Sequence, residues 1–91
     1  MNGKDLFIYT KRSMRPLFKE ADILQVVPYS DPEIRIGDII IFHSPEDATF
    51  IIHRVISVPN EVIRTKGDNN NEPEPLIISH KHVISKVGKK V

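Results

Sequence analysis

The chain has 91 residues, enough for one domain but not for two, so we expect residues 1–91 to form a single unit. Its 13 basic and 12 acidic side chains leave a net charge of +1, which argues against a general nucleic-acid binder. Because cysteine is absent, disulfides, zinc–thiolate sites and a thiol nucleophile are excluded.

The apolar segments of the first half are short and are separated by turn residues. Residues 3–9 are the best helical candidate. Residues 21–27 predict a strand that ends at Pro28. Residues 39–42 predict a second strand, which opens after a turn at Gly37.

The second half continues the pattern. Residues 49–58 form the longest predicted strand, and residues 61–66 are expected to pair with it as a hairpin. A polar loop follows over residues 67–75, and residues 82–87 predict the last strand, with a tail over residues 88–90. Many short Ile- and Val-rich strands predict a mainly β fold, a small curved or barrel-like sheet of about five to seven strands.

No stretch of the sequence reaches the roughly 18 consecutive apolar residues of a membrane-spanning helix. The apolar run at residues 6–8 is too short for a secretory signal peptide. We therefore expect a soluble, cytoplasmic protein with no membrane span of its own. A domain of this size has a modest core, so a homodimer is one way in which it would gain stability.

Ser13 is the first residue that could do chemistry. Serine becomes a nucleophile only when a neighbouring base takes its proton, and otherwise a loop serine is a turn or cap residue. Here it stands beside apolar Met14 and Leu17, and Pro16 stiffens the loop, so the segment could seat a substrate side chain. The residues alone leave both interpretations open.

His53 lies in the longest predicted strand, where alternation places it on one face with Ile51 and Val55. Aliphatic neighbours would keep an imidazole neutral near pH 7, as a general base requires. The structural alternative is a half-buried histidine bonded to a backbone carbonyl. Asp68 could orient such an imidazole, but aspartate after glycine is also ordinary turn chemistry.

A metal site is a further alternative. His80 and His82 are two residues apart and would share a face on a strand. With His43 or His53 they could hold zinc or copper, but no acidic or thiolate ligand is spaced to complete the site. We therefore predict no metal and no other cofactor.

Taken together, these segments resemble the serine peptidases of the signal peptidase I and LexA type. Residues 13–16, Ser-Met-Arg-Pro, resemble the nucleophile box of that family, and residues 36–42 resemble its Gly-Asp-hydrophobic strand. Residues 52–56 resemble the box of the general base, and residues 67–70 resemble the Gly-Asp-Asn turn. The base position holds His53, as in the archaeal and endoplasmic-reticulum branch, whereas most bacterial members have lysine there.

The resemblance implies the β core of the signal peptidases, in a small soluble member without a membrane anchor. It also implies a serine endopeptidase that cleaves an extended peptide or leader segment. Ser13 would be the nucleophile and His53 the base, and either Asp68 or Glu74 would orient the imidazole, with Asp68 favoured. The residues expected to contact substrate are Lys11, Met14 and Pro16.

Two departures from the family pattern keep a second function open. Arg12 stands where a small residue is common, and Lys11 stands where the family often supplies a hydroxyl to the oxyanion hole. The backbone N–H of Ser13, or Lys11 itself, would then have to stabilise the oxyanion. The alternative function is a catalytically impaired peptide-binding or regulatory module on the same scaffold.

Overall fold

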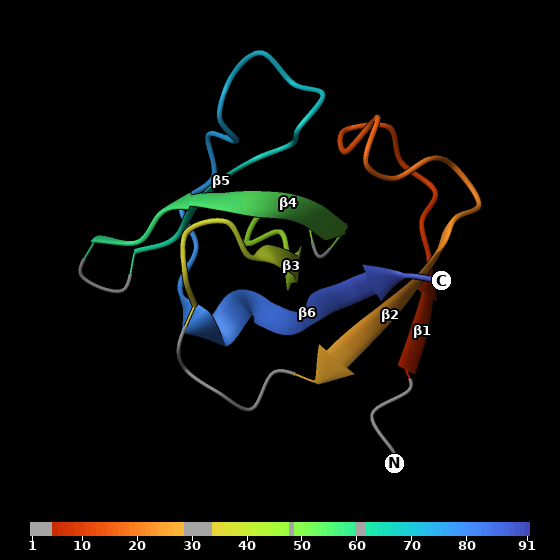
Figure 1. Ribbon diagram of the computed structural model, residues 1–91. Coiled ribbons are helices and arrows are strands. Elements are labelled where there is room, and N and C mark those ends of the chain that lie inside the picture. Colours follow the sequence, from red (N-terminus) through yellow and green to blue (C-terminus); the bar gives the residue numbers. More distant parts are fainter. Residues whose placement is uncertain (1–4, 29–33, 48, 60–61) are drawn as a thin grey trace.

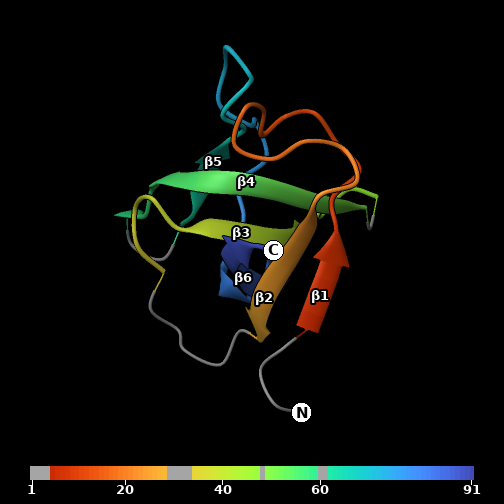
Figure 2. The same cartoon turned by 45° about the vertical axis from the view of Figure 1, so that its right-hand side comes forward.

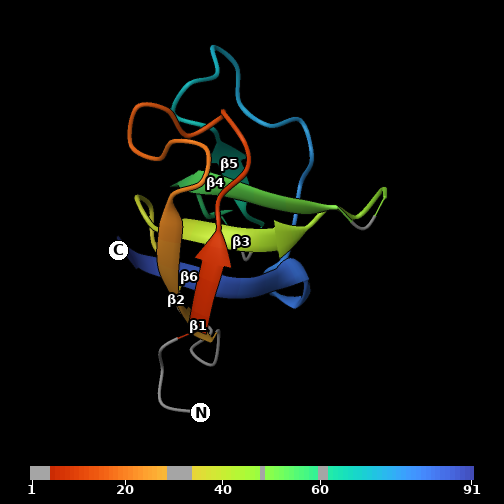
Figure 3. The same cartoon turned by 90° about the vertical axis from the view of Figure 1, so that its right-hand side faces the viewer.

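A computed structural model describes residues 5–28, 34–47, 49–59 and 62–91. Antiparallel strands form one six-stranded sheet in the order β1-β2-β6-β3-β4-β5 (Figure 1). The strands are β1 (Asp5–Ile8), β2 (Ile23–Pro28), β3 (Ile39–His43), β4 (Phe50–Ser57), β5 (Arg64–Lys66) and β6 (Val83–Lys90), and a 3-10 turn, η2 (His80–His82), precedes β6. The mainly β prediction is confirmed. The sheet is strongly curved, because β1 and β2 run crosswise to β3 and β4 (Figures 2 and 3).

The helix predicted over residues 3–9 is wrong, because residues 5–8 form the edge strand β1. This strand pairs antiparallel with β2, with Phe7 opposite Leu24. Leu6 and Ile8 are exposed, whereas Phe7 is partly buried and Tyr9 is fully buried. Burial therefore alternates with the period of two that a strand requires. Residues 3 and 4 lie outside the described residues.

The predicted hairpin is confirmed. β4 and β5 pair antiparallel, with Arg54 opposite Lys66 and Val55 opposite Thr65. β5 is shorter than the segment predicted over residues 61–66, and residues 60 and 61 of the connection are outside the described part. The strands predicted at residues 21–27 and 39–42 are found as β2 and β3, with ends shifted by at most two residues.

The tail predicted over residues 88–90 is instead part of β6. Lys89 and Lys90 pair with Gln25 and Leu24 of β2. The other side of β6 pairs with β3, where Lys86 lies opposite Ile40. β6 therefore joins β1 and β2 to β3, β4 and β5.

Two hydrophobic clusters lie on either side of β4. Ile52 belongs to the first cluster and Val55 to the second, as expected for side chains that alternate along a strand. The first cluster contains Tyr9, Met14, Phe18, Leu24, Val26, Ile41 and Ile52. The second contains Ile34, Ile40, Phe42, Val55, Ile63, Ile78 and Val83. Among the described residues, no helix is long and apolar enough to cross a membrane.

Candidate active site

Two loops meet on one side of the sheet, above β4. The connection between β1 and β2 carries Ser13, and the connection after β5 carries Asp68 and Glu74 (Figures 2 and 3). The backbone N–H of Asn69 donates to the carbonyl oxygen of Ser13 at 2.7 Å, and the Asn69 side chain donates to the carbonyl of Arg12 at 3.1 Å. These bonds hold the Ser13 segment against the second loop.

The Ser13 loop is fixed from beneath by the first hydrophobic cluster. Tyr9 and Met14 are fully buried, and Phe18 packs edge-on against Tyr9 with 5.7 Å between ring centroids. The backbone N–H of Met14 donates to the Tyr9 hydroxyl at 2.9 Å. Met14, which was expected to contact substrate, has no exposed surface and instead fixes the position of Ser13.

Gly67 permits the close approach of the two loops. A Cβ atom at this position would lie 2.7 Å from the carbonyl oxygen of Ser13 and 2.8 Å from the Ser13 Cβ. Both distances are shorter than real Cβ contacts allow, so any side chain here would push Ser13 away.

His53 is almost entirely buried, with 4% of its surface exposed. Its ring lies edge-on to Phe42, with 6.3 Å between centroids. Burial lowers the pKa of His53, and the carboxylates of Glu74 and Asp68 partly oppose that shift. The imidazole is therefore held in its neutral form, which is the form that accepts a proton.

The Nδ1 atom of His53 faces two polar groups. The Thr65 hydroxyl lies 3.5 Å away and the Glu74 Oε2 atom lies 4.0 Å away. Thr65 is buried and also fixes Glu74, because its carbonyl accepts a 2.8 Å hydrogen bond from the Glu74 backbone N–H. β5 thus supplies the Thr65 hydroxyl and, through its backbone, positions the Glu74 carboxylate near the same nitrogen.

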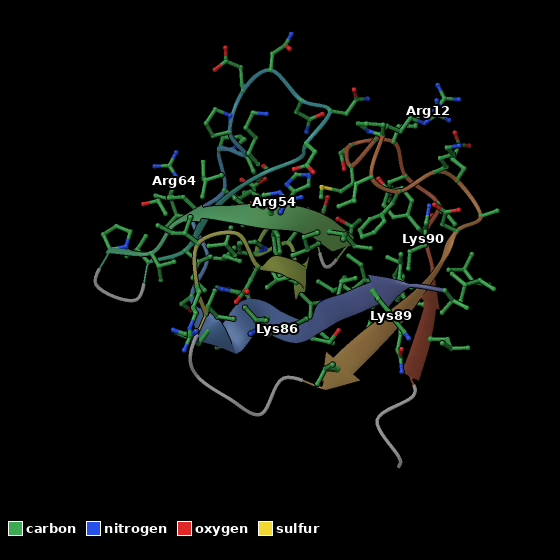
Figure 4. All side chains as sticks on the ribbon, viewed as in Figure 1. Arg12, Arg54, Arg64, Lys86, Lys89 and Lys90 are labelled. Atoms are coloured by element: carbon green, nitrogen blue, oxygen red, sulfur yellow. The ribbon has the colours of Figure 1, made fainter. Side chains whose placement is uncertain are left out.

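Asp68 has a different partner. Both of its carboxylate oxygens accept hydrogen bonds from Arg54, at 2.9 and 2.8 Å. Arg54 also donates to the carbonyl of Gly37 at 3.1 Å, and Figure 4 shows it beside β4. The hydrogen bonds from Arg54 lower the pKa of Asp68. This carboxylate ties its turn to β4, whereas the carboxylate at the imidazole nitrogen belongs to Glu74.

A hollow of about 190 Å³ brings the candidate residues together. Ser13, His53 and Glu74 come from three separate segments of the chain, and all three line it. The other lining residues are Lys11, Thr49, Phe50, Ile51, Ile52 and Asn70. Pro16 is exposed and lines neither this hollow nor the adjoining one described below.

His80 and His82 do not lie on a strand, so the expectation that they share a strand face is wrong. They form the 3-10 turn η2, where Nδ1 of His82 accepts a hydrogen bond from the backbone N–H of Ser79 at 3.1 Å. Within the described part of the chain, no three His, Cys, Asp or Glu side chains are grouped as a metal would require.

Thr65 and Tyr9 were not among the predicted site residues. The predicted hairpin could have indicated Thr65. When Thr65 pairs with Val55, the Thr65 side chain lies diagonally across from His53 on the same face of the sheet. No local pattern marked Tyr9, whose hydroxyl binds a backbone group five residues further along the chain.

Comparison with known proteins now identifies the class. The sequence profile of the family described as signal peptidase, peptidase S26, matches residues 5–86. The chain therefore belongs to the signal peptidase family S26, and the resemblance seen in its sequence boxes is confirmed.

Curated relatives point to one group within this family. The signal peptidase complex catalytic subunit sec11 of Dictyostelium discoideum is 31% identical over 86 residues, which cover 81% of this chain and 48% of the relative. The human signal peptidase complex catalytic subunit SEC11C is 40% identical over 63 residues, covering 64% of this chain and 33% of the relative. The chain thus spans less than half the length of these relatives.

These relatives correct one prediction. The assignment to the cytoplasm is wrong, because the proteins that the chain resembles are catalytic subunits of signal peptidase complexes. The same relatives give no support to a homodimer, since their names describe subunits of a larger complex.

Proposed function

We propose that this chain is a serine endopeptidase of the signal peptidase type, with Ser13 as nucleophile, His53 as general base and Glu74 as the acid that orients the base. The single observation that carries the proposal is the hollow of about 190 Å³ that all three side chains line. Membership of a peptidase family supports the same reaction class.

The environment of His53 suits a general base. Burial favours the neutral imidazole, and Nδ1 faces Thr65 and Glu74, which leaves Nε2 as the nitrogen that serves Ser13. In the proposed reaction the Ser13 Oγ bonds to the substrate carbonyl carbon while His53 takes the hydroxyl proton. His53 then gives that proton to the departing amine, and a water molecule repeats the sequence to release the acyl group.

Glu74 replaces Asp68 as the proposed orienting acid. The Asp68 carboxylate already accepts hydrogen bonds from Arg54, whereas the Glu74 carboxylate lies 4.0 Å from the His53 Nδ1. The backbone N–H of Glu74 also donates to Thr65, whose hydroxyl faces the same nitrogen. The distance between the Glu74 carboxylate and Nδ1 is longer than a hydrogen bond, but catalytic hydrogen bonds often tighten only when substrate binds. A protonated imidazole would draw the carboxylate closer.

The oxyanion hole is proposed to start at the backbone N–H of Ser13. In the described part of the chain this group has no hydrogen-bond acceptor of its own. A preorganised donor of this kind is typically worth roughly 3–4 kcal/mol in the transition state.

The proposed substrate is a peptide in extended conformation. A second hollow of about 310 Å³ adjoins the first and includes the apolar side chains of Phe7, Phe50 and Ile52, so it would take a substrate side chain. Because the relatives are named as subunits of a complex, we propose that partner proteins assist this chain as well.

The test is covalent labelling combined with cleavage. Wild-type protein should react at Ser13 with a fluorophosphonate probe and should cleave members of a peptide library, seen as new N-termini. Ser13→Ala and His53→Ala should lose both activities, whereas the control Ser57→Ala, at the end of β4, should keep them. Cleavage by Ser13→Ala at the wild-type rate would refute the assignment.

A second candidate is the peptide-binding module without catalysis. It is favoured by the two distances at the His53 Nδ1, 3.5 and 4.0 Å, which both exceed a good hydrogen bond. This alternative predicts peptide binding that survives His53→Ala and no probe reaction at Ser13. Stoichiometric labelling of Ser13 would eliminate it.

A further inference from the structure

Lys11 is a cation in an otherwise uncharged hollow. The hollow of about 310 Å³ is lined by Phe7, Thr10, Lys11, Thr49, Phe50 and Ile52. Four of these residues, Lys11, Thr49, Phe50 and Ile52, also line the hollow that holds Ser13 and His53. A side chain bound here would therefore belong to a residue close to the cleaved bond.

The charge of Lys11 lacks the close partner that neighbouring cations have. Arg12 and Arg15 pair with Glu20 at 3.0 and 2.8 Å, and Figure 4 shows Arg12 on the outer side of its loop. Among the described residues, no carboxylate lies within ion-pair distance of Lys11.

Asp47 is an acidic group whose charge interacts with that of Lys11, but its carboxylate already accepts hydrogen bonds. Its Oδ1 atom accepts hydrogen bonds from the hydroxyl and the backbone N–H of Thr49, at 2.8 and 3.2 Å. These bonds are the main reason that the pKa of Asp47 is lowered, and Lys11 is the smallest contributor. Lys11 therefore keeps most of its capacity to attract an anion.

Given the proposed peptidase function, we propose that Lys11 makes this hollow select a substrate residue with an acidic side chain, glutamate or aspartate. Phe7, Phe50 and Ile52 would pack against the methylene groups, and the ammonium of Lys11 would pair with the carboxylate. Glu74 would repel such a carboxylate only in the first hollow, because it does not line the second. The acidic side chain is thereby directed to one position in the substrate.

The competing role for Lys11 is in the oxyanion hole. A group that stabilises the oxyanion acts on every substrate alike, because the carbonyl oxygen is the same in all of them. A group that selects an acidic side chain changes the ratio between substrates. The two roles are therefore separated by comparing peptides that differ only in Glu and Gln.

The first experiment measures binding and requires no catalysis. The Ser13→Ala protein is used to select from a phage-displayed library of random decapeptides. Selected peptides should be enriched in Glu or Asp at one position, and a Glu peptide should bind about fivefold more tightly than its Gln counterpart. The preference should shrink in 1 M salt, which screens partly exposed charges.

Charge reversal supplies the control. Lys11→Glu, in the Ser13→Ala background, should reverse the preference toward Lys or Arg peptides. Lys19→Glu changes the net charge equally, from an exposed position in the same loop, and should leave the preference unchanged. The proposal is overturned if no peptide is selected, if no acidic position emerges, or if the acidic preference persists in Lys11→Glu.

The second experiment measures cleavage of the Glu and Gln peptides by otherwise wild-type protein. Lys11→Ala should lower the ratio of kcat/KM for the Glu peptide to kcat/KM for the Gln peptide about fivefold. An equal fall for both would overturn the selection role in favour of the oxyanion role. Acidic selection in the binding experiment without any cleavage would refute the peptidase assignment and leave the inference about Lys11 standing.

Discussion

The two loops that build the site are held in different ways. The Ser13 loop rests on buried Tyr9, Met14 and Phe18, and its ends are joined by the backbone bonds between Tyr9, Ala21 and Asp22. The loop after β5 is exposed from residue 68 to residue 73 and is held by backbone and ion-pair contacts. The proposed nucleophile, Ser13, is thus fixed by core packing, and the proposed acid, Glu74, by polar contacts that adjust more easily.

The difference explains the geometry around His53. A nucleophile must be placed accurately, and close packing provides that accuracy. Glu74 is held through its backbone bond to Thr65, so in the proposed reaction its carboxylate can move toward the imidazole as charge develops there. Variants at buried positions of the Ser13 loop should therefore lose stability, whereas variants of Glu74 in the loop after β5 should mainly lose activity.

The largest expected effect comes from the acid itself. Glu74→Gln should lower kcat roughly 10²- to 10⁴-fold, because the amide cannot stabilise the charged imidazole. Thermal unfolding should change little, since Glu74 is an ionisable group at the surface of the hollow.

Asp68→Asn is the matched control for that prediction. It should cost about 0.5–1 kcal/mol of stability, through loss of the partly exposed pair with Arg54, and should keep most of the activity. Greater loss of kcat in Asp68→Asn than in Glu74→Gln would return the orienting role to Asp68.

The next effect concerns the support of the Ser13 loop. Met14→Ala should destabilise the protein by about 2–5 kcal/mol, because it leaves a cavity beneath Ser13. Denaturant unfolding measures the loss, and Leu17→Ala, in the same loop but 40% exposed, is the control. Similar losses in the two variants would show that the loop does not depend on the core.

The contact between the loops gives a smaller effect on stability. Gly67→Ala should cost about 1–3 kcal/mol, since its Cβ would overlap Ser13. The relative fall in kcat should exceed the relative fall in the free energy of unfolding, because the overlap displaces the proposed nucleophile.

Gly88→Ala provides the comparison for Gly67→Ala. The nearest atom to a Cβ at Gly88 is the carbonyl oxygen of Gln25, at 3.4 Å, which is close to an ordinary contact. This variant should unfold like wild type. A Gly67→Ala protein with unchanged stability and activity would show that Ser13 has room to move.

The smallest effect is the pH dependence that His53 introduces. Because burial lowers its pKa in the folded protein, the unfolded chain takes up a proton first as the pH falls below about 6.5. Stability should therefore decrease from about pH 6.5 downward, toward the lowered pKa, and His53→Gln should remove this decrease. Unfolding measured against pH tests it, with His43→Gln, at an exposed position, as the control.

Much of the fold was predictable because β2, β3 and β4 are Ile- and Val-rich runs with turn residues between them. β1 was not, because Leu6, Phe7 and Ile8 are all apolar and show no alternation until their partner strand is known. The extension of β6 was missed for the same reason: Lys89 and Lys90 are strand residues only through their pairing with β2.

The residues of the candidate site could be predicted from sequence motifs, but the contacts between their side chains could not. The positions of Ser13 and His53 follow from local motifs. The choice between Asp68 and Glu74 depends on where the side chain of Arg54 reaches, and that is decided by the pairing of β4 with β5. The burial of Met14 likewise depends on Tyr9, which approaches it only when the loop is closed.

The position of β6 has a consequence for the order in which the centre assembles. Ser13 belongs to the part of the chain around β1 and β2, and His53 belongs to β4, yet the sheet between them is completed only by β6. Residues 83–90 must therefore dock before the sheet is continuous, and such pairing between distant segments is slow compared with hairpin formation. A chain in synthesis would therefore carry the proposed nucleophile, Ser13, and the proposed base, His53, on two parts of the sheet that are connected only when this strand is in place.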